Sequence, residues 1–157
     1  MRPARIIPGG TVATETPSPA WHGIPGNPYN PHAWVIGDPQ IGEGVWIGPF
    51  TVIDGSGGLV IGDRCDISSG VHIYSHSTVA RCVSERARNT ERASTEIGAH
   101  VHVGANAVIL MGAQIGDHSV VAAGAVVREH TFAPPYSVLR GVPAIVEPDA
   151  ARRFAAG

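Results

Sequence analysis

Residues 97–127 read IGAHVHVGANAVILMGAQIGDHSVVAAGAVV, with an Ile or Val at every sixth position. The same spacing occurs earlier in the chain, with a shift of two residues after Ile53. The positions in this frame are Ile41, Ile47, Ile53, Ile61, Ile67, Ile73, Ile97, Val103, Ile109, Ile115, Val121 and Val127. Such a period matches neither a helix, with about 3.6 residues per turn, nor a simple alternating strand, so it indicates an internal repeat.

The other positions of each hexad are also patterned. A small or β-branched residue stands four places after the aliphatic one, as in Cys65 and Ala107. At nine of the twelve positions three places after it stand Gly, Asn or His, which are Gly44, Gly70, Asn106, Gly112, Gly124, His76, His100, His118 and His130. Because Gly, Asn and His tolerate positive φ, we predict corners there, between short parallel strands that coil around an axis. Three strands per coil give about 18 residues per turn, which would stack His100 directly on His118.

The composition is consistent with an all-β protein. The 157 residues include 20 Gly and 13 Pro, which disfavour long helices. The net charge of −2 argues against a nucleic-acid-binding protein. Pro and Gly interrupt the N-terminal stretch MRPARIIPGG and no long apolar run follows, so we expect a cytoplasmic protein that does not enter a membrane. Cys65 and Cys82 lack the spacing of a zinc ribbon, and no metal is expected.

Three segments resemble the hexapeptide-repeat acyltransferases: IGEGVWIGPFTVI at 41–53, IGDRCDISSGVHI at 61–73, and residues 97–127. The resemblance covers about residues 34–146. It implies a left-handed parallel β-helix, although the general rule for parallel crossovers would favour the right hand. It also implies a CoA-dependent acyltransferase, with acetyl-CoA as co-substrate, that works as a homotrimer on a small acceptor.

The repeat frame also predicts the organisation of the chain. We expect an N-terminal cap segment at 1–33, the β-helix at 34–131 and a C-terminal extension at 132–157, with a short helix after Pro148. Within the β-helix the frame breaks at 77–96, which we interpret as a loop excursion about one coil long. Loops of this length in compact domains usually have a function.

His76 begins this excursion, in the string YSHST. Acyl transfer from a thioester needs an acceptor amine or hydroxyl that loses its proton, and imidazole, with an ordinary pKa of about 6.5, can accept it. In related acyltransferases a catalytic His lies at or near the start of this loop, so the resemblance implies that His76 is the general base. The alternative is that His76 only occupies a corner of the coil.

The resemblance also implies a coenzyme site. The string RGVPAIV at 140–146 looks like the one with which these enzymes leave the β-helix. In related acetyltransferases a Trp beside the coenzyme often stands at the position of His102, small residues approach the pantetheine with their backbone, and basic residues contact the phosphates. The corresponding positions are His102, Ala105, Ala123, Gly124, Arg128 and Arg140. An ordinary surface His and plain coil geometry are the alternatives.

The excursion is rich in charged residues, which are Arg81, Arg86, Arg88, Arg92, Glu85, Glu91 and Glu96. Such mixed charge usually forms a solvated, self-paired surface. The alternative is that one Arg binds an anionic substrate or the coenzyme phosphates, because a guanidinium suits both.

Three functions therefore compete. The first is acyl transfer to an amine or hydroxyl of a small acceptor, a sugar being one candidate. The second is a zinc protein related to the gamma-class carbonic anhydrases, which share the prism, although the two His of IGAHVHVG are more closely spaced than the paired ligands of that group. The third is a non-enzymatic scaffold, which would not need the long excursion.

Overall fold

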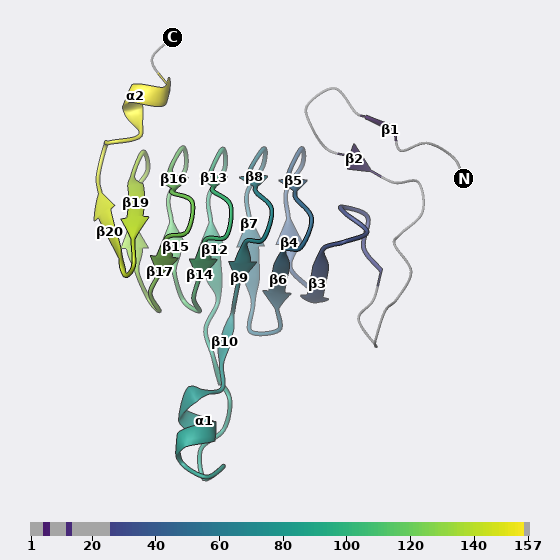
Figure 1. Cartoon of the computed structure of the whole chain (residues 1–157), viewed down its shortest axis with the longest axis vertical. Coiled ribbons are helices and arrows are strands. Elements are labelled where there is room, and N and C mark those ends of the chain that lie inside the picture. The colour runs from purple at the N-terminus through teal and green to yellow at the C-terminus, as the bar shows by residue number, and fades with distance from the viewer. Residues whose placement is uncertain (1–4, 7–11, 14–25, 156–157) are drawn as a thin grey trace.

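The computed structural model describes residues 5–6, 12–13 and 26–155. Short strands form a parallel β-solenoid of about six turns, from which one arm projects (Figure 1). The predicted all-β fold is therefore confirmed. The predicted cap at 1–33 lies largely outside the described residues. Its described part includes β1 (Arg5–Ile6) and β2 (Val12–Ala13), which form an antiparallel pair.

Three sheets form the walls of the solenoid. The first sheet contains β4 (Gln40–Ile41), β7 (Leu59–Ile61), β12 (Thr95–Ile97), β15 (Gln114–Ile115) and β18 (Phe132–Ala133). The second contains β5 (Trp46–Ile47), β8 (Asp66–Ile67), β13 (His102–Val103), β16 (Val120–Val121), β19 (Val138–Gly141) and β20 (Ala144–Glu147). The third contains β3 (Trp34–Gly37), β6 (Val52–Gly55), β9 (His72–Ile73), β14 (Val108–Ile109) and β17 (Val126–Val127). Neighbouring strands pair in parallel, except that β20 is antiparallel to β19.

The register of the third sheet follows the hexad frame. Ile109 pairs with Val127, one coil later in the sequence. Ile73 also pairs with Ile109, although they are twice as far apart in the sequence. The excursion therefore leaves the solenoid and returns in register after one coil length, as predicted.

The core is the column of aliphatic side chains inside the three walls. All the aliphatic residues of the hexad frame are buried except Ile41, which is partly buried. The small positions, among them Cys65, Val71 and Ala107, are fully buried as well. Burying an Ile or Val side chain contributes about 1.5–3 kcal/mol, so each residue of this column stabilises the solenoid.

The corners confirm the predicted left-handed positions. The φ angles of His100, Asn106, His118 and His130 lie between 56° and 59°. The predicted stack is also present, because the rings of His100 and His118 are 4.8 Å apart at an interplanar angle of 4°. Tyr136 extends this stack, at 4.9 Å from His118.

The C-terminal segment begins inside the solenoid, because β18 and β19 continue the first and second sheets. The chain then turns back through β20 and ends in α2 (Arg152–Ala155), the short helix predicted after Pro148. None of the helices in the described part of the chain is long and apolar enough to cross a membrane.

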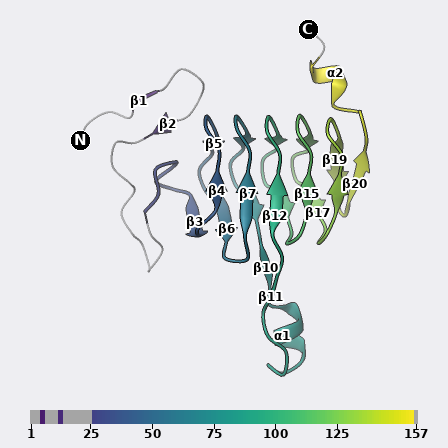
Figure 2. The ribbon, with the colours of Figure 1, turned by 180° about the vertical axis from the view of Figure 1, so that it is seen from behind.

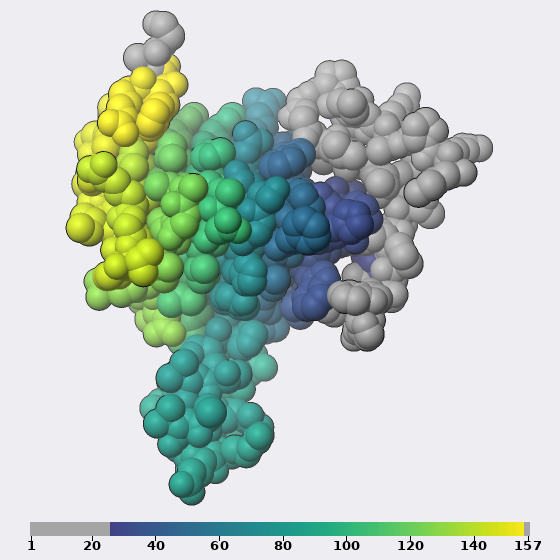
Figure 3. Space-filling model, in the orientation of Figure 1, coloured from purple at the N-terminus to yellow at the C-terminus, as the bar shows by residue number. Residues whose placement is uncertain are grey.

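The excursion forms the projecting arm, which we define as residues 76–92. Its base is an antiparallel pair of β10 (His76–Ser77) with β11 (Glu91–Arg92). Its tip contains α1 (Val79–Val83). Views from opposite sides show the arm extending away from the coils (Figures 1 and 2), and the space-filling view shows it as a separate lobe (Figure 3).

Candidate active site

The base of the arm contains a hydrogen-bonded pair of side chains. His76 Nδ1 lies 2.5 Å from Asp54 Oδ2 and 3.3 Å from Ser56 Oγ. The Asp54 side chain is 1% exposed and that of His76 is 33% exposed. Within the described residues no group hydrogen-bonds to His76 Nε2. A carboxylate on Nδ1 favours the tautomer whose lone pair is on Nε2, so the accessible nitrogen can accept a proton.

Asp54 is held in place by its neighbours in the third sheet. Its Oδ1 accepts the Ser56 N–H at 3.0 Å, and its Oδ2 accepts the Ser75 N–H at 3.3 Å. The Ser75 hydroxyl donates to the Asp54 carbonyl oxygen at 2.6 Å and accepts the Gly57 N–H at 2.8 Å. These bonds fix the carboxylate on two adjacent coils, so its orientation toward His76 is set before any substrate binds.

The charge of Asp54 follows from the same contacts. Burial acts to raise the pKa of Asp54, but hydrogen bonds from Ser56, His76 and the Ser75 backbone lower it below its ordinary value. The carboxylate is therefore ionised at neutral pH. It can stabilise a positive charge that develops on His76 during proton transfer.

Tyr74 lies beside the pair. Its ring meets the ring of His76 edge-on, with centroids 6.3 Å apart, and its hydroxyl lies 2.9 Å from His72 Nδ1. Burial, together with the negative charge of Asp54, raises the pKa of Tyr74 above its ordinary value. Tyr74 is thus a neutral phenol that packs against one side of the His76 imidazole.

The structure separates His76 from the corner residues of the coil. His76 belongs to a strand, and its φ is not among the positive values that mark the other His corners. The sequence analysis did not find Asp54, although it has a signal. Asp54 follows Ile53 at the place where Gly follows half of the frame residues, and the two-residue shift of the repeat comes directly after it.

Three of the six predicted coenzyme residues, Ala105, Ala123 and Gly124, lie at one corner, between the second and third sheets. Gly124 donates its N–H to the Ala105 carbonyl oxygen at 2.9 Å, and Ala123 and Gly124 are exposed. A Cβ built on Gly124 would meet no heavy atom within 4 Å. His102 is exposed on β13, in the second sheet. We call Ala105, Ala123 and Gly124 the open corner.

The two predicted Arg residues lie in different places. Arg128 follows β17 and Tyr74 follows β9, two strands of the third sheet. Both residues therefore lie at the same edge of that sheet, where the arm begins. Arg140 is on β19, close in the sheet to the open corner, and pairs with Glu147 at 2.5 Å. The third sheet separates His76 from the open corner of the same chain, and its width of about six residues corresponds to roughly 15–20 Å.

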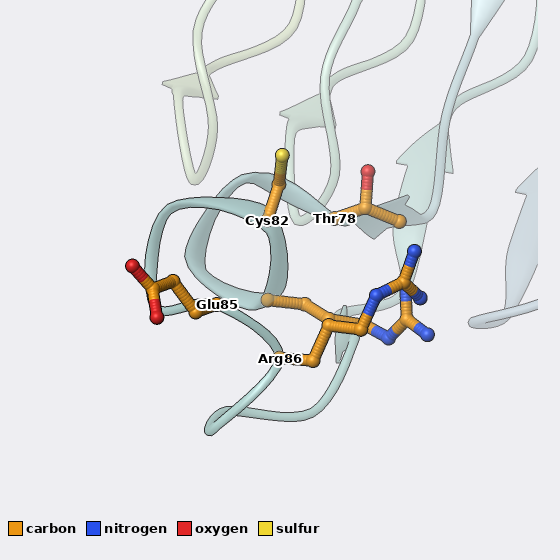
Figure 4. Close-up of a pocket in the computed structure, with 5 residues that line it drawn as sticks. Thr78, Cys82, Glu85 and Arg86 are labelled. Carbon is orange, nitrogen blue, oxygen red and sulfur yellow. The ribbon is translucent and has the colours of Figure 1, made fainter.

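The tip of the arm contains a hollow of about 470 Å³, lined by Thr78, Arg81, Cys82, Glu85 and Arg86 (Figure 4). We call it the arm pocket. The expectation of a self-paired surface holds for Arg88, which bonds Glu91 at 2.8 Å. For Arg81 and Arg86 there is no ion pair with any residue that the structure describes.

The zinc alternative gains no support from the geometry. Within residues 26–155 no three His, Cys, Asp or Glu side chains are grouped so that they could hold a metal ion. Cys65 is buried, and burial as the main cause raises the pKa of its thiol to about 11. Its Sγ–H donates to the Gly98 carbonyl oxygen at 3.0 Å, as expected for a core residue.

Two family models match the chain. The model described as bacterial transferase hexapeptide (six repeats) matches residues 94–129. The model described as hexapeptide repeat of succinyl-transferase matches residues 40–75. No curated protein sequence matches the chain significantly.

Solved structures share the fold. A hexapeptide-repeat acetyltransferase from Vibrio cholerae, complexed with acetyl coenzyme A, is 30% identical, with a TM-score of 0.65 over 74% of this chain and 63% of that one. A galactoside acetyltransferase in complex with coenzyme A is 27% identical, with a TM-score of 0.62 over 74% and 61%. This chain thus spans less than two thirds of either relative.

A more distant structure shows the fold alone. It is an N-acyltransferase from Bacillus cereus in complex with dTDP and 3-hydroxybutyryl-CoA, 20% identical, with a TM-score of 0.64 over 79% of this chain and 73% of that one. The repeat, the three-walled solenoid and the structural relatives agree with one another. The chain therefore contains hexapeptide repeats of the bacterial transferase type at residues 40–75 and 94–129, and its fold matches the left-handed parallel β-helix.

Proposed function

We propose that this protein transfers an acyl group, acetyl in the first instance, from acyl-CoA to an amine or hydroxyl of a small acceptor, a sugar being one candidate. His76 is the general base in this proposal. The observation that carries it is the Asp54–His76 pair at the base of the arm. Two relatives above 25% identity, crystallised with acetyl coenzyme A or coenzyme A, support the choice of co-substrate.

The chemistry assigned to the pair is proton transfer. The acceptor oxygen or nitrogen forms a bond to the thioester carbonyl carbon while His76 Nε2 takes its proton. The tetrahedral intermediate then expels the thiolate, the C–S bond breaks, and the proton on His76 returns to the sulfur to give free CoA. Asp54 holds the imidazole in the productive tautomer throughout and stabilises its positive charge.

The open corner is the proposed site for the coenzyme, which supplies the activated acyl group. The residues present fit this role, because Ala123 and Gly124 are exposed and a Cβ on Gly124 would meet no heavy atom within 4 Å. His102 and Arg140 lie on the adjacent second sheet, although the guanidinium of Arg140 is already paired with Glu147. Arg128 lies at the same edge of the third sheet as His76, away from the open corner of its own chain. We therefore assign Arg128 to the coenzyme site only where the open corner of a second copy meets this edge.

A site shared between copies follows from this separation. The outward side chains of the third sheet are mostly apolar, since inward and outward residues alternate along each strand. They are Trp34, Val52, His72, Val108 and Val126. In the proposed homotrimer this face is covered, and the arm of one copy lies beside the open corner of the next. The cytoplasmic location predicted from the sequence is part of the same proposal.

Steady-state kinetics with acetyl-CoA and a panel of amines and sugars would test the base. His76→Ala should lower kcat by about 10²- to 10⁴-fold, because proton transfer by a positioned side chain contributes about that much. The matched control is His100→Asn, since Asn106 already occupies an equivalent left-handed corner. Near-wild-type turnover by His76→Ala, with the fold intact, would remove His76 from the mechanism.

Mixing two impaired variants, assayed at an acetyl-CoA concentration well below the raised KM, would test the shared site. Gly124→His obstructs the open corner with a residue that other corners of this chain accommodate at similar φ. We expect it to raise the KM for acetyl-CoA. Random reassembly of Gly124→His with His76→Ala should restore about a quarter of the sites in a closed ring. If mixing restores nothing while each variant assembles normally, both groups act within one copy.

A further inference from the structure

The arm pocket presents two positive charges and one hydroxyl to the same space. Its lining includes Arg81, Arg86 and Thr78. We propose that the arm pocket binds an anionic group of the acyl acceptor, a phosphate or a carboxylate. This inference rests on the proposed function, which it extends by naming the class of acceptor.

The first argument is the balance of charge in the pocket. The two guanidinium groups have no ion-pair partner within residues 26–155, whereas Arg88 of the same arm is neutralised by Glu91 at 2.8 Å. Glu85 also belongs to the lining, but its carboxylate points away from the guanidinium of Arg86 (Figure 4). The pocket therefore has a net positive charge that a bound anion would neutralise.

The second argument is the backbone that brings the two Arg residues together. After α1 the chain reverses through Glu85 and Arg86, with φ angles of 54° and 71°. The Arg86 N–H donates to the Arg81 carbonyl oxygen at 2.8 Å and closes this turn. Two successive left-handed residues that are not Gly are energetically unfavourable. The unfavourable backbone conformation of Glu85 and Arg86 thus occurs in the turn that places Arg86 next to Arg81.

The third argument is the chemistry of the lining groups. A guanidinium offers paired N–H donors that match the oxygens of a phosphate or carboxylate. The Thr78 hydroxyl makes no capping bond to α1, so it remains available as a further donor. In the close-up, the Thr78 oxygen and the Cys82 sulfur point to the same side of the arm (Figure 4). These groups suit an anion better than a neutral sugar hydroxyl.

The position of the pocket assigns the anion to the acceptor. Thr78 is two residues from His76, so their Cα atoms are at most about 7 Å apart. An acceptor whose reacting amine or hydroxyl lies at His76 can therefore place a charged group, several bonds away, in the pocket. The open corner, proposed for the coenzyme, lies across the third sheet from His76 of the same chain.

Binding measurements on the full chain provide a test that does not need turnover. Inorganic phosphate and succinate are titrated by calorimetry at constant ionic strength into the wild type and into Arg81→Gln/Arg86→Gln. The control is Arg88→Gln/Arg92→Gln, which removes the same charge from the same arm outside the pocket. We expect the pocket variant to bind phosphate about 10- to 100-fold more weakly, because it loses both guanidinium groups that would donate to the anion. The control should bind normally.

Turnover then separates the possible sources of the anion. An amino sugar is compared with its phosphate ester, and an amine with the corresponding amino acid. In at least one of these pairs, the wild type should acylate the anionic compound with a higher kcat/KM than the uncharged one. The pocket variant should lose this preference, with little change in the KM for acetyl-CoA. A pocket variant that keeps the preference, or one that raises only the KM for acetyl-CoA, would overturn the assignment. If only the pocket variant loses phosphate binding, the anion subsite is supported, even where no acceptor is acylated. The absence of acylation would count only against the proposed function.

Discussion

Asp54 and His76 are 22 residues apart in the sequence, yet Asp54 Oδ2 and His76 Nδ1 lie 2.5 Å apart. The contact exists because β6 and β9 are neighbours in the third sheet, with Ile53 paired with Ile73. Asp54, which follows Ile53 within β6, and Tyr74, which follows β9, therefore lie at the same edge of the sheet. The arm then begins close enough for His76 to reach the buried carboxylate.

Replacing Asp54 with Asn tests whether the charge of this carboxylate assists catalysis. Asp54→Asn keeps the size of the side chain but can present an N–H to His76, which favours the wrong tautomer. We expect kcat to fall by about 10- to 10³-fold while the KM for acetyl-CoA changes little. Asp38→Asn, at an exposed position, is the control. Unchanged kcat in Asp54→Asn would show that His76 does not depend on this partner.

The same variant tests the effect of Asp54 on stability at different pH. The pKa of Asp54 is lowered in the folded protein, so the ionised carboxylate stabilises the fold above the ordinary carboxyl pKa of about 3.9. That contribution is lost as the pH falls through the lowered pKa. We expect the melting temperature of the wild type to exceed that of Asp54→Asn at pH 7 and the gap to narrow below about pH 4. A gap that stays constant from pH 7 to pH 3 would contradict this prediction.

The aliphatic column can be tested by deleting side-chain volume. Ile109 is 0% exposed and lies between Ile73 and Val127 in the register. Ile109→Ala should destabilise the protein by about 2–5 kcal/mol, through lost burial and the cavity left behind. The control is Val60→Ala, where the side chain is 38% exposed, with an expected cost below about 1 kcal/mol. Equal losses in chemical denaturation would mean that the column is not the main source of stability.

The corners predict an unusual order of substitutions. His130 has a φ of 56°, which Gly adopts without strain and which a β-branched residue strongly disfavours. His130→Val should therefore be less stable than His130→Gly by about 1–2 kcal/mol, although Val is generally the better residue for a β protein. Melting temperatures of the two variants are the measurement. Greater stability of His130→Val would mean that the corner does not require positive φ.

Much of the fold could be predicted because each hexad obeys the same local rule. An inward aliphatic such as Ile109, a small residue such as Ala113 and a corner such as Gly112 repeat along the chain, so the pattern does not depend on distant contacts. The length of the excursion followed from the same frame, since the aliphatic positions return in register after it. His76 was found by its place at the start of this excursion.

The partner of His76 could not be found in this way. In the register Asp54 lies beside Tyr74, at the end of β9, and the irregular chain of the arm then brings His76 onto its carboxylate. The turn that joins Arg81 to Arg86 likewise depends on two left-handed residues that no local preference favours. Because its pattern repeats, the solenoid can be recognised from the amino-acid sequence alone. The groups of the candidate site, such as Asp54 and His76, come from different coils. They come into contact only when the irregular segments between the regular coils fold.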